Sequence, residues 1–321
     1  MSVFITGSTG CIGIATLTYL LDHGVDRVVG YNRSINWERI DARYRERVKL
    51  LKGDITDGAR LRAAILETRP AQIIHLAAFQ TPDCQAHPFE GMQVNVEGTM
   101  NLFRAAAELK EKLQRVVFAS SAAVYGPRTL YPAPTVDTEA PLRPSNLYGY
   151  WKVAGEGVAQ AFHRETGIPT VSLRLATTYG PGRDKGLTSA PTTAIKSVVR
   201  GVPFHMPYQG RENYHYVADV GAGFAQAATE PFEGCRAFNL RGRTITVNDF
   251  LEFLQQIAVC EGIEIKADLG IAPDATTMPF ACDLDDRATL DVFPRMPLTD
   301  IPEGIRKSLE HFMQMAADSK R

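Results

Sequence analysis

The sequence is poor in three features that mark large classes of proteins. None of its apolar runs approaches the ~18 residues of a membrane-spanning helix. Its 5 cysteines are odd in number and follow no paired spacing, which favours a reducing compartment, the cytoplasm, over a disulfide-stabilised secreted protein. Its 7 histidines form no His-x-x-x-His pattern, so no metal site is predicted.

The sequence also has no excess of positive or negative charge. The 321 residues carry a net charge of −1, and basic residues between positions 39 and 52 are interspersed with acids. Binding to nucleic acid or to a membrane surface is therefore not expected, and a small-molecule substrate is. The first strand is expected to begin at Ser2, which leaves no room for a signal peptide.

The chain does contain short apolar strands that alternate with helices. Apolar runs without alternation are typical of parallel strands buried on both faces. This order predicts an α/β fold of the Rossmann type, a doubly wound parallel sheet whose ligand site lies at the carboxyl ends of the strands. Strands are expected at residues 2–6, 27–31, 48–51, 72–78, 115–120 and 170–175, and helices at 14–23, 91–112, from 57 and from 148.

The regular winding ends near residue 175. Residues 1–175 are therefore expected to form an NAD(P)-binding Rossmann domain, to which residues 216–240 return. Residues 176–321 are expected to form mainly a smaller, substrate-binding C-terminal lobe.

A glycine-rich turn lies between the first expected strand and the first helix. Its first glycine permits a tight turn, its second lets backbone approach a pyrophosphate, and its third lets the helix pack closely on the sheet. A plain strand–helix turn that needs glycines is the alternative. The candidate cofactor residues here are Gly7, Thr9, Gly10, Cys11, Ile12 and Gly13.

The end of the second strand carries no acid for the adenosine ribose. Arg33 can instead pair with a 2′-phosphate, and Asn32 and Ser34 can add hydrogen bonds. This favours NADP over NAD, with a surface arginine in a loop as the alternative.

Asp54 and Ile55 follow the third strand. Asp54 can accept from the adenine amino group with Ile55 packed on the ring, or it can merely cap the helix that begins near Asp57. The fourth strand ends in Leu76-Ala77-Ala78, and these residues let a cofactor pass over the strand end.

Tyr148 and Lys152 are four residues apart at the start of an expected helix and therefore share one face. A positive charge beside a phenol lowers its pKa from about 10, so the pair is a candidate proton-transfer device. A solvated helix face is the alternative. Ser121, at the end of the fifth strand, is placed at the same edge of the sheet.

These motifs together resemble those of the extended short-chain dehydrogenase/reductases, the NAD-dependent epimerase/dehydratase family. The resemblance implies that Tyr148 is the general acid/base, that Lys152 lowers its pKa and binds the nicotinamide ribose, and that Ser121 binds the reacting oxygen. It also implies cofactor contacts at Asn95 and Ser120, and a homodimer formed through residues 91–112 and 148–164. The motifs that carry the resemblance are the glycine loop, Asp54, residues 76–78, Asn95, Ser121, Tyr148 and Lys152.

Departures from the family pattern concern the substrate. Ala122-Ala123 replaces the Asp-Glu of dehydratases, which argues against dehydration. Thr177, Glu212 and Met278-Pro279 replace groups that hold a nucleotide, and a Glu212 carboxylate in the cleft would repel a diphosphate. The stretches at residues 122–127 and 148–156 are similar to those of threonine 3-dehydrogenases and sugar-acid dehydrogenases, so a smaller substrate is expected.

The loop 182–193 offers cations and hydroxyl groups for a carboxylate or a polyol, although a solvated lid is an equal alternative. The sequence predicts an oxidoreductase that interconverts a secondary alcohol and a ketone on a small carbohydrate-like or hydroxy-acid substrate. The alternatives are a sugar 4-epimerase with tightly bound NAD and a non-catalytic dinucleotide sensor. Substrate contacts are expected at Ser121, Ala122, Thr177, Arg183, Thr188 and Ser189.

Overall fold

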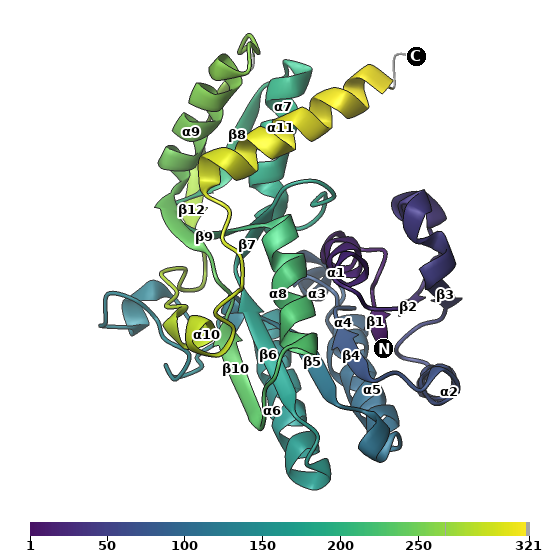
Figure 1. The fold of residues 1–321 in the computed structure, drawn as a ribbon. Helices are drawn as coiled ribbons and strands as arrows, with labels where there is room; N and C mark the ends of the chain where they lie inside the picture. Colours follow the sequence, from purple (N-terminus) through teal and green to yellow (C-terminus); the bar gives the residue numbers. More distant parts are fainter. Residues whose placement is uncertain (267, 319–321) are drawn as a thin grey trace.

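A central sheet of seven parallel strands organises the molecule (Figure 1). The computed structural model describes residues 1–266 and 268–318. The strand order is β10-β6-β5-β4-β1-β2-β3, which contains the 3-2-1-4-5-6 order of a dinucleotide-binding fold. The predicted Rossmann fold is therefore confirmed. The strands are β1 Ser2–Thr6, β2 Arg27–Asn32, β3 Val48–Lys52, β4 Gln72–His75, β5 Arg115–Ser121, β6 Thr170–Leu175 and β10 Cys235–Asn239.

Helices cover both faces of this sheet because its strands are apolar on both sides. In β1, Val3 and Ile5 pack in the core beneath α1 and α8, and Phe4 between them packs on the other face with α2, α5 and α6. Such alternation follows from the two-residue period of a strand. The helices are α1 Cys11–Asp22, α2 Gly58–Thr68, α3 Thr81–Ala86, α4 Pro88–Met92, α5 Gly98–Ala107, α6 Leu147–Thr166 and α8 Val217–Thr229.

Two predicted elements differ in the structure. The fourth strand ends at His75 rather than at residue 78, because the N–H groups of Leu76 and Ala77 donate to the Thr6 hydroxyl. The helix expected at 91–112 is α4, a π-helical turn at Gln93–Glu97, and α5, followed by a 3₁₀ turn at Lys110–Lys112. The π turn carries Asn95, whose side chain binds the backbone of Phe79.

The second half of the chain forms the smaller lobe at the top of Figure 1, where α7, α9 and α11 lie. It contains a three-stranded sheet, β11-β9-β7, and a two-stranded sheet, β12-β8. Strand β10 leaves this lobe to pair with β6, and α8 packs against α1. The elements are β7 Thr177–Tyr179, β8 Phe204–Gln209, β9 Arg211–Tyr216, β11 Arg243–Thr246, β12 Leu269–Thr277, α7 Ala190–Arg200, α9 Val247–Cys260, α10 Arg287–Val292 and α11 Ile301–Asp318.

No helix in the described part of the chain combines the length and apolar character that crossing a membrane requires.

Candidate active site

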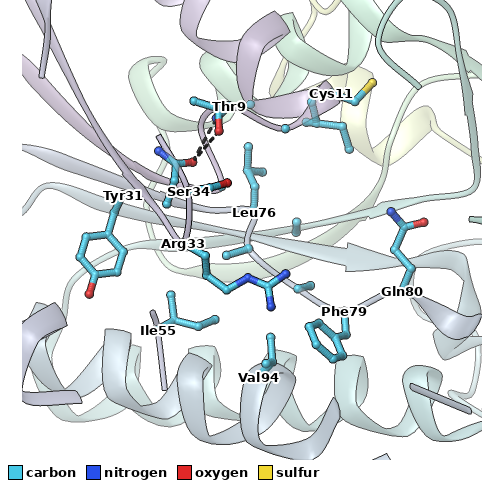
Figure 2. Close-up of a pocket in the computed structure, with 18 of the residues that line it drawn as sticks. Thr9, Cys11, Tyr31, Arg33, Ser34, Ile55, Leu76, Phe79, Gln80 and Val94 are labelled. Atoms are coloured by element: carbon cyan, nitrogen blue, oxygen red, sulfur yellow. Dashed lines mark hydrogen bonds between the residues drawn. The ribbon is translucent and has the colours of Figure 1, made fainter. Parts of the chain in front are cut away.

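A cavity of about 310 Å³ lies at the carboxyl ends of the strands of the N-terminal domain (Figure 2). It brings together the predicted glycine loop, the tip of β2, the tip of β3 and the residues after β4. Of the predicted cofactor residues, Asn95, Ser120, Tyr148 and Lys152 do not line it. Its lining is Gly7, Thr9, Gly10, Cys11, Ile12, Gly13, Tyr31, Asn32, Arg33, Ser34, Gly53, Asp54, Ile55, Leu76, Ala77, Ala78, Phe79, Gln80, Val94, Ala119 and Arg183.

The glycine loop has the close approach that a dinucleotide phosphate site needs. Gly7 has a φ of 73°, a conformation that favours glycine. A Cβ at Gly13 would lie 2.3 Å from the Gly7 carbonyl oxygen, so only glycine fits at this crossing. Helix α1 begins at Cys11 without a side-chain cap, which leaves its first N–H groups free for an anion. These residues fit a nicotinamide dinucleotide.

The tip of β2 is arranged differently from the prediction. The Asn32 amide accepts from the N–H and hydroxyl of Thr9 at 3.1 and 3.2 Å and donates to the Ser8 hydroxyl at 2.9 Å. Asn32 therefore fixes the glycine loop through its amide while it also lines the cavity. Arg33 reaches across the cavity with its guanidinium 5.3 Å from the centre of the Phe79 ring (Figure 2). Ser34 is exposed beside it.

The tip of β3 shows which of the two expected roles Asp54 does not have. Asp57, not Asp54, caps α2, by accepting from the Arg60 N–H at 3.0 Å. Asp54 accepts from the N–H and hydroxyl of Thr56 and stays on the cavity wall next to Ile55.

Asn95 does not line the cavity and instead binds the backbone of a residue that does. Its amide accepts from the Phe79 N–H at 2.8 Å and donates to the Phe79 carbonyl at 3.0 Å. It thus holds the segment after β4 in place, while its neighbour Val94 lines the cavity.

A second cavity of about 150 Å³ adjoins the first and shares Ile12, Leu76, Ala78, Gln80, Ala119 and Arg183 with it. It contains the predicted Ser, Tyr and Lys, which come from β5 and α6. The lobe contributes its other wall. Its further lining is Thr81, Pro82, Ser120, Ser121, Ala123, Asn146, Tyr148, Lys152, Leu175, Ala176, Thr178, Leu187, Thr188, Met278, Pro279 and Phe280.

The Tyr148 phenol projects into the second cavity from the first turn of α6, which Asn146 caps by accepting from the Gly149 N–H at 2.9 Å. Burial raises the pKa of Tyr148 to about 12, while the Ser121 hydroxyl and the positive charge of Arg183 oppose this rise. That Lys152 lowers this pKa stays a prediction. A phenol with this pKa is protonated near neutral pH.

The Lys152 ammonium is buried beneath the phenol. Its Nζ donates to the Ala119 carbonyl at 2.7 Å and lies 5.5 Å from the centre of the Tyr148 ring. Burial lowers the pKa of Lys152 to about 8, and the nearby Cys84 and Glu156 oppose this.

A buried ion pair behind the site escaped the sequence analysis. Arg174 on β6 binds Glu156 on α6 through Nε–Oε1 at 2.9 Å and Nη2–Oε2 at 2.7 Å. The Ser120 hydroxyl donates to the same Glu156 Oε1 at 2.5 Å. The pair thus joins α6 to β6, and Ser120 joins it to the end of β5. A glutamate four residues after Lys152, together with an arginine in an apolar strand, was the available signal.

The structure brings only some of the predicted substrate residues together. Ser121, Arg183 and Thr188 line the second cavity. Ala122 is fully buried away from it, and the Ser189 hydroxyl donates to the Gly186 carbonyl at 2.7 Å. Both predictions are therefore wrong as direct contacts.

The prediction for Thr177 is also wrong, by one residue. Thr178 lines the cavity, whereas Thr177 is fully buried and donates to Glu212 Oε2 at 2.6 Å. Neighbouring side chains of a strand point to opposite faces, so only one of the two can reach the site. Glu212 is fully buried and does not line the cavity, so the argument that its carboxylate repels a diphosphate in the cleft is wrong as well.

Glu212→Gln is expected to stabilise the protein at alkaline pH. Burial raises the pKa of Glu212 from 4.5 to about 7, so the folded protein binds this proton more tightly than the unfolded chain. The stability that this group contributes is therefore complete below about pH 4.5 and is lost as the pH rises through about 7. At pH 8 the carboxylate costs about 3 kcal/mol, which a neutral amide that still accepts from Thr177 avoids.

Urea unfolding of both proteins at pH 5 and pH 8 measures this difference. We expect a gain of about 2–3 kcal/mol at pH 8 and little difference at pH 5. A gain that is equal at both pH values would show that Glu212 does not titrate between them.

Comparisons with known proteins identify the family of this chain. A sequence model of the NAD dependent epimerase/dehydratase family matches residues 3–240. D-erythronate dehydrogenase of Cupriavidus necator is 29% identical over 275 residues, which cover 80% of this chain and 82% of that protein. UDP-glucuronate 4-epimerase 6 of Arabidopsis thaliana is 30% identical over 341 residues, covering 98% of this chain and 72% of that protein.

A solved structure, the UDP-glucose 4-epimerase of Thermus thermophilus in complex with NAD, superposes with a TM-score of 0.79. It is 25% identical, and the match covers 97% of this chain and 99% of that one. The chain therefore belongs to the NAD-dependent epimerase/dehydratase family, the extended short-chain dehydrogenase/reductases, and is a nicotinamide-dependent oxidoreductase or epimerase.

Proposed function

We propose that the protein is an NAD(P)-dependent oxidoreductase that interconverts a secondary alcohol and a ketone on a small polar carbohydrate-like or hydroxy-acid substrate. The observation that carries the proposal is the convergence of Ser121, Tyr148 and Lys152 on a cavity of about 150 Å³. This volume is below the roughly 300–1,000 Å³ of cavities that hold drug-sized ligands. A cavity of this size accommodates a small substrate, and the relative named D-erythronate dehydrogenase points the same way.

Each of these side chains has a distinct task in the proposed reaction. A bound nicotinamide would supply the hydride chemistry. Tyr148 would give a proton to the ketone oxygen, or take one from the alcohol, while the Ser121 hydroxyl holds that oxygen. Lys152 would remain fixed by its bond to the Ala119 carbonyl and would present its charge below the phenol.

A substrate panel tests the proposal directly. Aldonates, uronates and hydroxy acids are added with NAD or NADP, and the absorbance of the reduced nicotinamide is followed. We expect net cofactor reduction with at least one of the acids. No change with any of them, together with epimerisation of a nucleotide sugar, would contradict the proposal.

A sugar 4-epimerase is the second candidate, because a 4-epimerase matches 98% of this chain at 30% identity. An epimerase reduces and reoxidises its cofactor within one turnover, so it retains the cofactor tightly. Purified protein that carries stoichiometric, non-exchanging NAD would favour this candidate.

For the cofactor we propose a preference for NADP. Arg33 is an exposed cation at the tip of β2, where the cavity would receive the adenosine end of a dinucleotide. Arg33→Ala is expected to raise the KM for NADP on the order of 10- to 100-fold, the range for one charge-assisted contact, and to leave the KM for NAD nearly unchanged. Steady-state kinetics with both cofactors measure this, and an equal change for both would contradict the preference.

We further propose that the protein works as a homodimer in the cytoplasm. Phe89 on α4 is 83% exposed and Tyr150 on α6 is 58% exposed, and apolar surface of this kind supports an interface between copies. All five cysteines are unpaired, which supports a reducing compartment. A monomer in sedimentation equilibrium would contradict the dimer.

A further inference from the structure

We propose that Arg183 binds a carboxylate of the substrate, so that the natural substrate is a polyhydroxy carboxylic acid. This inference rests on the oxidoreductase function proposed above and names its substrate class. Arg183 follows the Gly180-Pro181-Gly182 turn after β7, in which both glycines have positive φ values of 117° and 83°. The turn brings its guanidinium to the wall shared by the two cavities.

The guanidinium of Arg183 is incompletely paired. Its Nη2 donates to two neutral groups, the Thr188 hydroxyl at 2.6 Å and the Gln80 amide oxygen at 3.3 Å. Its Nε is buried without a hydrogen-bond partner. Burial also lowers the pKa of Arg183 from its usual value, although a guanidinium stays protonated.

No described residue neutralises this cation through an ion pair. The neighbouring Asp184 carboxylate forms its ion pair with Lys196 instead. Arg183 is half-buried, and a partly desolvated charge without a counterion is unfavourable. This loss is recovered when a ligand brings an anion to the vacant donors. The arrangement therefore selects for a negatively charged ligand.

The position of Arg183 favours the substrate over the cofactor phosphates as the source of this anion. The uncapped start of α1 is already available for the phosphates. Thr188, which holds the Arg183 Nη2, lines only the second cavity. The charge of Arg183 lowers the pKa of the Tyr148 phenol, and both residues line the second cavity. An anion bound to Arg183 would therefore place its carbon chain next to the acid/base.

The surrounding groups suit a carboxylate on a hydroxylated chain. A guanidinium forms charge-assisted hydrogen bonds with a carboxylate, and the Arg183 Nη1 carries donors that Thr188 and Gln80 do not occupy. Thr178, Thr188 and Gln80 add hydroxyl and amide groups to the same cavity for the hydroxyls of the chain. Met278, Pro279 and Phe280 add apolar surface to the wall of the same cavity.

Matched pairs of acid and neutral probes test the inference. The probes are D-erythronate with erythritol and D-gluconate with D-glucitol, assayed with the preferred cofactor. Arg183→Met is expected to lower kcat/KM for the acids on the order of 10- to 100-fold, the range for one charge-assisted contact, and to leave the alditols essentially unchanged. Arg183→Lys should retain part of the preference for the acids.

Lys185→Met is the matched control, because Lys185 is exposed, belongs to the same loop and lines neither cavity. It removes one positive charge and should leave the acid-to-alditol ratio unchanged. An equal loss for acids and alditols in Arg183→Met, or weaker dinucleotide binding without substrate, would overturn the inference.

A binding measurement separates this inference from the proposed reaction. Calorimetry follows D-gluconate and D-glucitol added to the dinucleotide-loaded wild type and to Arg183→Met. Tighter binding of the acid by the wild type alone supports the role of Arg183 even if no probe is turned over. Equal binding of acid and alditol by the wild type overturns it, whatever the turnover assays show.

Discussion

Tyr148→Phe is expected to lower kcat by about 10²- to 10⁴-fold, the usual contribution of a positioned acid/base, without weakening dinucleotide binding. The substitution removes only the phenol oxygen, the group that would exchange a proton with the reacting oxygen. Steady-state turnover and fluorescence titration with the cofactor measure the two properties separately.

Tyr150→Phe is the control for this experiment. It removes the same hydroxyl two residues away on α6, from a side chain that is 58% exposed, and should leave kcat unchanged. If Tyr148→Phe retains full activity, Tyr148 is not the acid/base, and a non-catalytic, dinucleotide-sensing role would gain support.

The pKa of Tyr148 also predicts a pH dependence for the wild type. Burial raises the pKa of Tyr148 to about 12, so the phenolate that accepts a proton from an alcohol is scarce near neutral pH. Oxidation by the wild type should therefore accelerate as the pH rises through the alkaline range, and reduction should not. Oxidation that is independent of pH in the wild type would contradict this role of the phenol.

Arg174→Met is expected to destabilise the protein by about 3–5 kcal/mol, because it leaves one charge of a buried pair without its partner. Both side chains of the Arg174–Glu156 pair are almost fully buried. Arg174 also donates from Nη1 to the Tyr125 hydroxyl and the Thr138 carbonyl, both at 2.8 Å. The substitution therefore weakens two contacts of β6, one with α6 and one with the loop that carries Thr138.

The double variant Arg174→Met/Glu156→Gln is the control. It removes the uncompensated carboxylate and should recover a large part of the lost stability, because the two sites are coupled. Urea unfolding of the wild type and the two variants measures this. A loss below about 1 kcal/mol in Arg174→Met, the scale of an exposed pair, would show that the pair is not buried in solution.

The parts of the fold that the sequence predicted well depend on local patterns. Strand β1 is a short apolar run, and the glycine loop after it is a continuous motif, so both could be read from neighbouring residues. Parallel strands place their carboxyl ends at one edge, which is why Ser121 and Tyr148 could be expected together although they belong to different elements.

The errors depend on contacts between distant parts of the chain. Thr177 and Thr178 are equivalent in the sequence, and only the pairing of β7 with β9 decides which one faces the cavity. Glu212 was expected in the cleft because the sequence does not show that Thr177 binds it in the interior. The π turn around Asn95 and the burial that raises the Tyr148 pKa likewise arise only from tertiary packing.

The stoichiometry of nicotinamide reduction tests the central claim most directly. The wild type is incubated with a polyhydroxy acid, and the acid consumed is compared with the reduced cofactor released. An oxidoreductase with the proposed activity produces one reduced nicotinamide for each acid oxidised. Conversion of a sugar with no net reduced cofactor would contradict the proposal and identify the protein as an epimerase.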